Sequence, residues 1–362
     1  MLYSLLTYFF KEIALFRYIT FRTAMASMTG LLVTFLFGRI IINFIKKYNI
    51  CDKIRNDGPK THFVKQGTPT MGGIIMIISI LSGVLLWADL SNSFIQVMLV
   101  STIGFAILGF TDDLIKLTNK KGVTPAYKLL FQFLIAGGIF LFVLNSRSYN
   151  SLNTFTNILF IKNVMIDLSW MFFPFVIAVI IGTTNAVNIT DGLDGLAAGL
   201  LAIIFSVFAI ILYILGNRVF SGYLNMMYIP EIGELTLYIL CSAFVSLGFL
   251  WFNSYPAEIF MGDTGSLTLG GILGTAAVLS KQEILLFIAG GVFVSEAMSS
   301  MLQTFYFKIT KRSTGEGIRL FKMAPIHHHF EQMGIKEPKI VMRFYILAVI
   351  FGIIALSTLK IR

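Results

Sequence analysis

The residues best suited to chemistry in this sequence are carboxylates at the edges of apolar segments. Asp263 lies in the run Phe260-Met261-Gly262-Asp263-Thr264-Gly265-Ser266. A carboxylate near the apolar core of a bilayer is costly, so it is a candidate for function. Mg²⁺ takes one or two carboxylates together with phosphate oxygens, and we expect Asp263 to be its first ligand. Phe260 in the same run is suited either to stacking on a nucleobase or to an ordinary place at the membrane interface.

Asp112 and Asp113 form an adjacent pair directly after Gly109-Phe110-Thr111. Neighbouring residues on a helix point about 100° apart, so the pair cannot grip one ion without unwinding the helix. Two separate roles are more natural: one acid lies near a metal or another cation, and the other is available to a nucleophile. The alternative is a solvated helix end.

The segment from Asn185 to Gly195 gathers polar residues between two apolar runs. Asp191 and Asp194 share one face if the segment is helical, and its glycines let a ligand approach the backbone. The helix N-terminus that follows favours anions. Thr190 and Asp191 are also good helix caps, but capping alone does not require two Asn, two Asp and two Gly in so short a segment.

Three of the four histidines are consecutive, at His327, His328 and His329. Their side chains diverge around a helix, so they cannot all bind one metal, and imidazoles suit zinc or phosphate better than Mg²⁺. Arg319 and Lys322 lie just upstream. This neighbourhood favours recognition of an anion over a polar loop that holds histidines by chance.

The composition indicates what kind of protein positions these residues. The chain is 56% hydrophobic and only 13% charged, which excludes a soluble globular domain of this size and indicates a polytopic membrane protein. Its spans should be helical, because lipid offers backbone groups no hydrogen-bond partner. We expect a single domain, residues 1–362, with ten transmembrane helices at roughly 24–45, 71–90, 94–111, 127–144, 169–187, 196–215, 235–252, 262–280, 284–307 and 340–359.

Basic residues orient these ten spans. Of the 28 lysines and arginines, most lie in the loops after the first, third and ninth spans, which predicts that these loops are cytoplasmic and both termini periplasmic. The net charge of +10 is therefore explained by topology rather than by a nucleic-acid partner. All the polar motifs then fall on the cytoplasmic face. On the other face, two β-rich runs around Lys162-Asn163 predict a small β-hairpin between the fourth and fifth spans.

Carboxylates for a hard cation, basic groups for phosphate and a membrane setting together indicate phosphoryl transfer involving a lipid phosphate. At this point the chain resembles the phospho-N-acetylmuramoyl-pentapeptide transferases, in the superfamily of polyprenyl-phosphate N-acetylhexosamine-1-phosphate transferases. The matching motifs run across nearly the whole chain, and the three-histidine form is typical of the muramoyl-pentapeptide branch. They are Thr68-Pro69-Thr70-Met71-Gly72-Gly73, Gly109 to Asp113, Asn185 to Gly195, Phe260 to Ser266, and Ala324-Pro325-Ile326-His327-His328-His329-Phe330.

The resemblance implies Mg²⁺-dependent transfer of phospho-MurNAc-pentapeptide from its UDP carrier to undecaprenyl phosphate. The products would be lipid I and UMP, in the first membrane step of peptidoglycan synthesis. It also implies ten transmembrane helices with outward termini, a homodimer, and a place in the bacterial inner membrane with the active site on the cytoplasmic face.

Carried over motif by motif, the resemblance makes Asp263 the Mg²⁺ ligand and Asp112 and Asp113 essential. Asp112 would be the base toward the lipid phosphate. Lys116 and Lys128 would lie near phosphates, and His327 would lead the histidine cluster with His328 and His329. The remaining residues would bind the nucleotide: Lys65, Thr70, Asn188, Asp191, Asp194 and Phe260.

Three other functions are compatible with parts of the sequence. A sibling transferase that uses UDP-GlcNAc is the nearest, and a substrate assay with both donors separates the two. A secondary transporter would place its polar residues near the bilayer midplane at broken helices, whereas these motifs gather at one face. An intramembrane aspartyl protease needs two aspartates, fewer than the candidates here.

Overall fold

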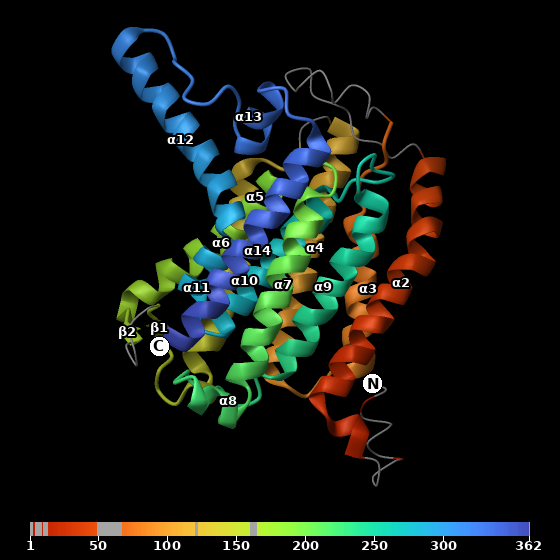
Figure 1. Cartoon of the computed structure of the whole chain (residues 1–362), viewed down its shortest axis with the longest axis vertical. Coiled ribbons are helices and arrows are strands. Elements are labelled where there is room, and N and C mark those ends of the chain that lie inside the picture. Colours follow the sequence, from red (N-terminus) through yellow and green to blue (C-terminus); the bar gives the residue numbers. More distant parts are fainter. Residues whose placement is uncertain are drawn as a thin grey trace.

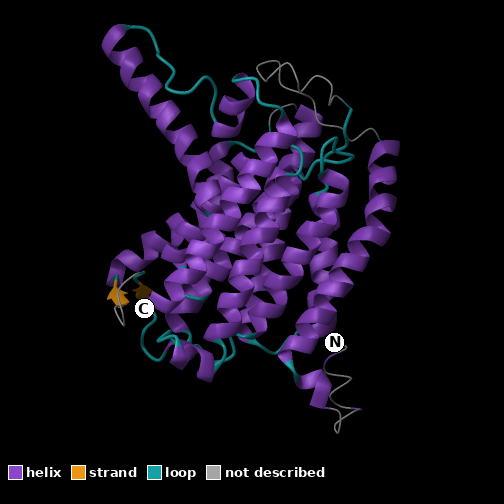
Figure 2. Cartoon of the chain, viewed as in Figure 1, coloured by secondary structure: helices purple, strands orange, loops and turns teal. Residues whose placement is uncertain are grey.

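Long apolar helices make up nearly the whole of the computed structural model, with one two-stranded hairpin (Figures 1 and 2). The structure describes residues 3, 9, 14–48, 67–119, 122–159 and 165–361. In chain order, the elements are η1 (Ala14–Arg17), α2 (Ile19–Lys47), α3 (Gly73–Trp87), α4 (Ser93–Asn119), α5 (Pro125–Asn145), η3 (Arg147–Tyr149), β1 (Phe155–Asn157), β2 (Met165–Asp167), η4 (Ser169–Met171), α6 (Phe172–Thr190), α7 (Leu196–Leu215), α8 (Arg218–Tyr223), α9 (Glu234–Asn253), α10 (Gly262–Leu279), α11 (Glu283–Ala289), α12 (Gly291–Thr314), α13 (Ile326–Gln332) and α14 (Glu337–Ile361).

The helices confirm an all-helical membrane protein that crosses the bilayer several times. Within the described ranges, seven helices are long and apolar enough to span a membrane, and the bent pair α11 and α12 raises this number to eight. α3 is a shorter apolar helix of 15 residues. Side chains on the outside of such a bundle face lipid, which is why many large apolar residues of α2, α5 and α14 are exposed.

The ninth predicted span, 284–307, is wrong as a continuous helix. The chain bends there by 85° between α11 and α12. The break falls at Gly290-Gly291, and small residues in pairs are a common site of sharp helix kinks. As a result α12 leaves the bundle as a projecting arm (Figure 1).

α10 lies at the centre of the bundle, where every residue from Thr264 to Leu279 is buried. It packs against α4, α6 and α3. Glycines allow this close approach: a Cβ added at Gly109 of α4 would lie 2.3 Å from the carbonyl oxygen of Asp263, and one at Gly73 would lie 2.1 Å from the backbone nitrogen of Gly265. Small residues let membrane helices pack backbone to backbone in this way.

The predicted hairpin is confirmed between α5 and α6. β1 and β2 pair antiparallel, with Phe155 opposite Asp167 and Asn157 opposite Met165. The strands are shorter than the β-rich runs in the sequence, and the turn at Lys162-Asn163 lies outside the described residues.

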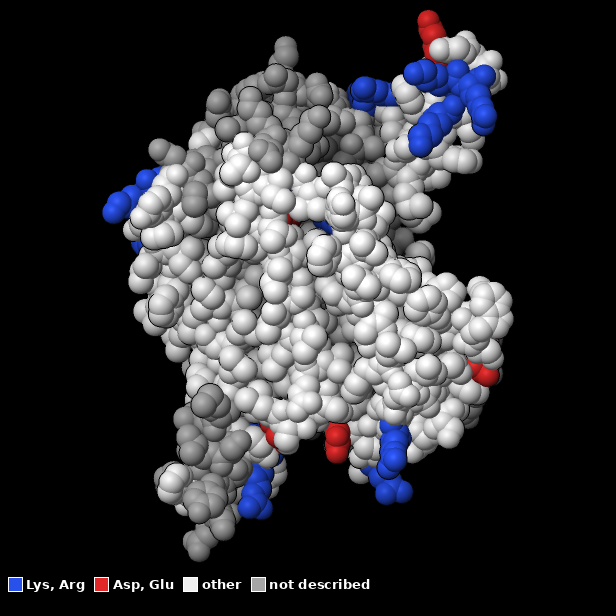
Figure 3. Space-filling model, turned by 180° about the vertical axis from the view of Figure 1, so that it is seen from behind, with Lys and Arg blue, Asp and Glu red and all other residues white. Residues whose placement is uncertain are grey.

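The two ends of the bundle hold different structural elements. The hairpin, α8, the start of α2 and the end of α14 lie at one end, and α13 and the tip of α12 lie at the other (Figure 1). Figure 3 shows basic side chains near both ends and a wide uncharged belt between them. This belt is the surface that a lipid bilayer would cover.

Candidate functional site

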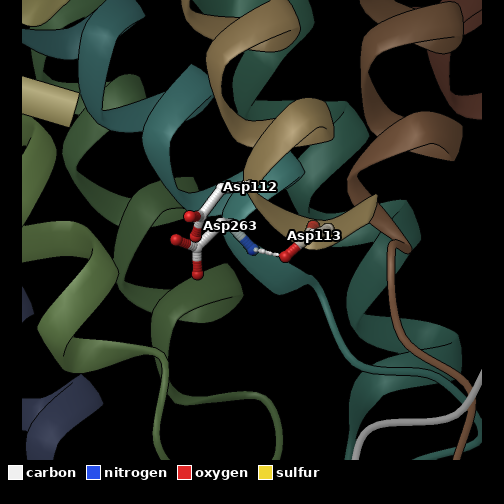
Figure 4. A group of neighbouring side chains, drawn as sticks. All are labelled: Asp112, Asp113 and Asp263. Atoms are coloured by element: carbon white, nitrogen blue, oxygen red, sulfur yellow. Dashed lines mark hydrogen bonds between the residues drawn. The ribbon is translucent and has the colours of Figure 1, made fainter. Parts of the chain in front are cut away.

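The paired aspartates lie inside α4, because this helix runs on to Asn119 rather than ending at residue 111 as predicted. Both carboxylates are buried, and they leave the helix in different directions (Figure 4). Asp112 accepts a hydrogen bond from the backbone N–H of Val123 at 2.6 Å and pairs with Lys116 at 2.8 Å. Asp113 turns toward the start of α10. The two acids therefore have different partners, and the two separate roles expected for them stay a prediction.

Asp113 caps the N-terminus of α10 from a neighbouring helix. Its oxygens accept hydrogen bonds from the N–H of Asp263 at 3.1 Å, the N–H of Thr264 at 2.8 Å and the Thr264 hydroxyl at 2.6 Å. The first N–H groups of a helix have no partner within the helix, so an acceptor here stabilises its start. Gly262, just before, has a φ of +71° and lies against the same carboxylate. Asp113 therefore fixes where Asp263 stands.

Asp263 is the meeting point of three helices. Lys128 of α5 donates to its Oδ2 at 2.5 Å, Lys116 of α4 pairs with its Oδ1 at 2.7 Å, and Asn188 of α6 donates to Oδ1 at 3.0 Å. Asn188 also donates to the Ser266 hydroxyl at 2.8 Å. Two ammonium groups thus compensate a cluster of carboxylates that would otherwise repel one another.

This acidic cluster is compatible with a metal ion. Among the residues that the structure describes, Asp112, Asp113 and Asp263 each offer an oxygen, and these oxygens lie within 4.8 Å of one another. All-oxygen donors are the set that hard cations such as Mg²⁺ prefer. Figure 4 shows the carboxylates of Asp112 and Asp263 close together, with Asp113 on the other side of the Asp263 backbone.

Backbone hydrogen bonds join the segment before α3 to the segment before α10. Phe260 donates its N–H to the carbonyl of Pro69 at 2.8 Å, and the N–H of Gly72 donates back to the carbonyl of Phe260 at 2.8 Å. This pairing brings Thr70 close to Gly262, which also lies against the carboxylate of Asp113. Phe260 is half-buried. Lys65, which precedes this segment, lies outside the described residues.

The polar segment after Asn185 begins as the end of α6 and continues as a turn. α6 continues to Thr190, and residues 191–195 form a turn rather than a helix, so Asp191 and Asp194 do not share a helical face. Burial, together with the nearby carboxylates of Asp263 and Asp113, raises the pKa of Asp191 to about 7.

Asp194 stabilises the same turn through hydrogen bonds. Its carboxylate accepts the N–H of Ala257 at 3.0 Å, and its own N–H donates to Glu337 of α14 at 2.7 Å. Asn253 accepts the N–H of Gly195 at 3.1 Å and donates to the carbonyl of Ile259 at 2.8 Å. These contacts tie the turn to the segment that leads into α10.

The three histidines form the short helix α13 and have three different environments. His327 is fully buried, and its Nδ1 lies 2.9 Å from a carboxylate oxygen of Glu296 in α12. His328 Nδ1 lies 2.7 Å from Glu331, and His329 Nδ1 accepts the N–H of Lys322 at 3.1 Å. Divergence around a helix was expected, and a shared metal is not compatible with these partners.

His327 connects α12 to the turn that carries Asp191. A Cβ added at Gly192 would lie 2.4 Å from His327 Nε2, so the imidazole packs directly on this turn. The sequence analysis did not include Glu296 among the candidate site residues. The signal was present, because Glu296 is an acid inside an apolar run, and such residues are functional candidates by default.

The fold and the site define a polytopic membrane protein with an acidic cluster enclosed by its helices. Comparison with known proteins makes it a transferase: glycosyl transferase family 4 matches residues 95–281, and phospho-N-acetylmuramoyl-pentapeptide-transferase signature 1 matches residues 65–77. The chain belongs to the phospho-N-acetylmuramoyl-pentapeptide-transferase family.

Relatives with this name match along the whole chain. The protein from Thermodesulfovibrio yellowstonii is 48% identical, with 100% of this chain and 99% of the relative covered. The one from Pelagibacter ubique is 46% identical, with 100% of both chains covered. The one from Rickettsia rickettsii is 49% identical, with 96% of this chain and 95% of the relative covered. The resemblance drawn from the motifs is therefore confirmed.

Proposed function

We propose that this chain transfers phospho-MurNAc-pentapeptide from UDP-MurNAc-pentapeptide to undecaprenyl phosphate and releases UMP. The product is lipid I, the first membrane-bound intermediate of peptidoglycan synthesis. Family membership over the full length supports this reaction. The observation that carries it is the position of Asp263, which lies at the start of a central helix between two lysines and an asparagine.

Asp263 is the proposed Mg²⁺ ligand, with Asp112 beside it. Asp113 contributes by anchoring the start of α10, because its oxygens are occupied by the N–H groups of Asp263 and Thr264. Mg²⁺, when bound, would neutralise charge on the donor's diphosphate. Lys116 and Lys128 would exchange part of their pairing with Asp263 for contacts to phosphate oxygens.

The reaction we propose is a direct displacement. An oxygen of the lipid phosphate attacks the phosphorus that bears the sugar, and the bond from that phosphorus to the bridging oxygen breaks. UMP leaves with the bridging oxygen and its electron pair. A phosphomonoester has a second pKa of about 6, so the attacking group is already an anion near neutral pH. Asp112 would therefore orient the lipid phosphate and accept any residual proton from it.

The donor would bind across the segments that meet around the cluster. Phe260 would stack on the base, with Thr70, Asn188 and Asp191 beside it. Asp194 would hold the turn of the pocket in place through its contact with Ala257. Lys65, which lies outside the described residues, stays a predicted member of this pocket. His328 and His329 would contact the donor's phosphates or sugar, and the buried His327 would position α13.

The membrane arrangement we propose has ten spans in one domain, residues 1–362. α3 and α10 count as spans, and α11 with α12 forms the broken ninth. Both termini would be periplasmic, and the motif-bearing end would face the cytoplasm of a bacterial inner membrane. We also propose a homodimer. The start of α2 and the end of α14 lie at the same end of the bundle (Figure 1), which supports an even number of membrane crossings.

A transfer assay tests the proposed function. Purified protein in detergent should move labelled phospho-MurNAc-pentapeptide to undecaprenyl phosphate with Mg²⁺ and not with a chelator. UDP-GlcNAc in the same assay should give no product, and a product from it would favour the sibling reaction instead.

Asp263→Asn should lower turnover by two orders of magnitude or more, or about 3 kcal/mol in activation free energy, because the amide loses the charge that holds the cation. Asp167→Asn at the exposed hairpin is the matched control and should retain wild-type turnover. Near-normal turnover of Asp263→Asn at saturating Mg²⁺ would remove this residue from the site.

A further inference from the structure

Gln132 is a buried polar side chain within the apolar helix α5. The residues that α5 buries in the bundle are Gln132, Ala136, Ile139 and Val143, so the glutamine is the only polar one among them. A polar side chain inside a membrane helix is costly, which makes it a candidate for function. The site described above does not include it.

The partner of Gln132 is Asn185 of α6. The side-chain amide of Asn185 donates to Oε1 of Gln132 at 3.0 Å, and it also donates to the carbonyl of Ile181, one turn back in its own helix, at 2.8 Å. The Nε2 group of Gln132 is buried without a hydrogen-bond partner. A buried donor without an acceptor costs free energy, so stability alone does not explain a glutamine at this position.

Gln132 and Asn185 lie one helical turn from two residues that hold Asp263. Lys128 precedes Gln132 by four residues and Asn188 follows Asn185 by three, so the members of each pair share a helix face. Lys128 donates to Oδ2 of Asp263 at 2.5 Å, and Asn188 donates to Oδ1 at 3.0 Å. The contact between α5 and α6 therefore lies directly next to the contacts that both helices make with the acidic cluster.

The apolar packing of α5 determines its position only weakly. The helix buries four of its 21 residues, Gln132 included, and a Cβ added at Gly137 or Gly138 would meet nothing within 4 Å. Hydrogen bonds are directional, so a polar pair between apolar helices sets which residues face each other. Without the bond from Asn185, α5 could turn or slide against α6 and carry Lys128 with it.

We propose that Gln132 is a positioning residue for the transfer reaction: it fixes α5 against α6 and thereby holds the Lys128 ammonium at Asp263. The proposal rests on the proposed function, in which Lys128 exchanges part of its pairing with Asp263 for contacts to phosphate oxygens. The ammonium lies 2.5 Å from Asp263 and 3.7 Å from Asp112. A small displacement of α5 would therefore change its place between the two carboxylates.

Gln132→Met tests the proposal, because methionine has a similar size and removes both polar groups. Asn185 keeps the carbonyl of Ile181 as an acceptor, and the unpartnered amide is gone, so the thermal midpoint in detergent should not fall. Turnover at saturating substrates should fall by about tenfold, because small misplacements of a catalytic group are costly. The KM for donor and for lipid acceptor should each change by less than about twofold.

Gln96→Met is the matched control. Gln96 is exposed on α4, where its amide donates to the carbonyl of Leu90. This variant makes the same chemical change away from the contact between α5 and α6, so its turnover and its thermal midpoint should both equal those of wild type.

A double-mutant cycle tests whether Gln132 acts through Lys128. Lys128→Gln should lower turnover by itself, and Gln132→Met added to it should lower turnover no further, because the group to be positioned is absent. A residue that supports the fold in general would instead multiply the two losses.

Three results would overturn the proposal. Wild-type turnover in Gln132→Met would show that α5 keeps its position without the amide pair. Losses that multiply in the double variant would separate Gln132 from Lys128. A thermal midpoint that falls together with turnover would make Gln132 a structural residue only. Wild-type protein that turns over no donor would refute the proposed function itself, and this is visible before any variant is measured.

Discussion

At the scale of single residues, neighbouring side chains of one type have separate tasks. Asp112 faces two lysines, whereas Asp113, one residue on, accepts the first N–H groups of α10. The histidines divide in the same way, because His327 is buried against Glu296 while His328 and His329 are only half-buried. Burial and partner, rather than residue type, decide which of them a substrate can contact.

Glu296→Ala should destabilise the protein more than Glu296→Gln. Alanine leaves the buried Nδ1 of His327 without its acceptor, which costs about 1–3 kcal/mol, whereas glutamine keeps an oxygen in place. Thermal unfolding in detergent measures the difference, and Ser295→Ala on the exposed side of the same helix is the control. Equal midpoints for the two Glu296 variants would show that the contact with His327 does not contribute.

Asp191 should make the folding stability of the protein depend on pH, and a substitution at this one residue can test this. Its carboxyl has a pKa raised from 3.8 to about 7 by burial and nearby acids, so the folded state keeps this proton longer than the unfolded chain. The resulting stability is present below pH 3.8 and is lost as the pH rises through about 7.

We therefore expect Asp191→Asn to flatten the fall in thermal midpoint between about pH 4 and pH 7. Asp167→Asn on the hairpin is the control, because hydrogen bonds from Thr154 and Ser169 lower the pKa of that carboxyl, out of this window. Midpoint profiles that run parallel in Asp191→Asn and wild type would show that Asp191 does not titrate differently on folding.

At the scale of elements, the approach of α4 to α10 places the carboxylates of the acidic cluster. Gly109→Ala would put a methyl group 2.3 Å from the carbonyl oxygen of Asp263, so one helix must move. Overpacking of this kind costs about 1–3 kcal/mol, and the shift should also lower turnover by tenfold or more. Unfolding midpoints and the transfer assay measure both effects.

Gly137→Ala in α5 is the matched control, since nothing lies within 4 Å of a Cβ added there. It should be neutral or slightly stabilising, because alanine favours the helix. If Gly109→Ala had wild-type stability and turnover, the two helices would have more freedom than their packing indicates.

The bend between α11 and α12 is the other feature that matters at this scale. It directs α12 out of the bundle, and Glu296 near the start of α12 contacts His327 of α13. A straight ninth helix would leave α13 without this support. The arm therefore links the histidine helix to the membrane-spanning part.

At the scale of the whole molecule, the two ends should face different compartments. In a background with both cysteines replaced, Lys311→Cys on the arm should react with a membrane-impermeant maleimide only after the cells are opened. Arg218→Cys in α8, at the opposite end, should react on intact cells. Labelling of both positions from the same side would refute the proposed topology.

The sequence alone determined the class of protein, the approximate ranges of most helices and the identity of the motifs. Hydropathy and basic loops act locally along the chain, so they can be read without a structure. The family resemblance came from motifs such as Phe260 to Ser266, and the full-length relatives confirmed it. The hairpin between α5 and α6 was also predicted by local pattern.

Tertiary structure decided which partners these residues have. Lys128 and Asp263 are 135 positions apart, and Asp113 and Thr264 are 151 apart, so no local pattern specifies either contact. The same holds for the contact of Glu296 with His327 and for the packing of His327 on the turn at Asp191. The 85° bend of the ninth span followed from packing and a glycine pair inside an apolar run whose hydropathy indicates one continuous helix. Contacts between distant residues depend on how the helices pack, and the packing of each helix depends on all the others.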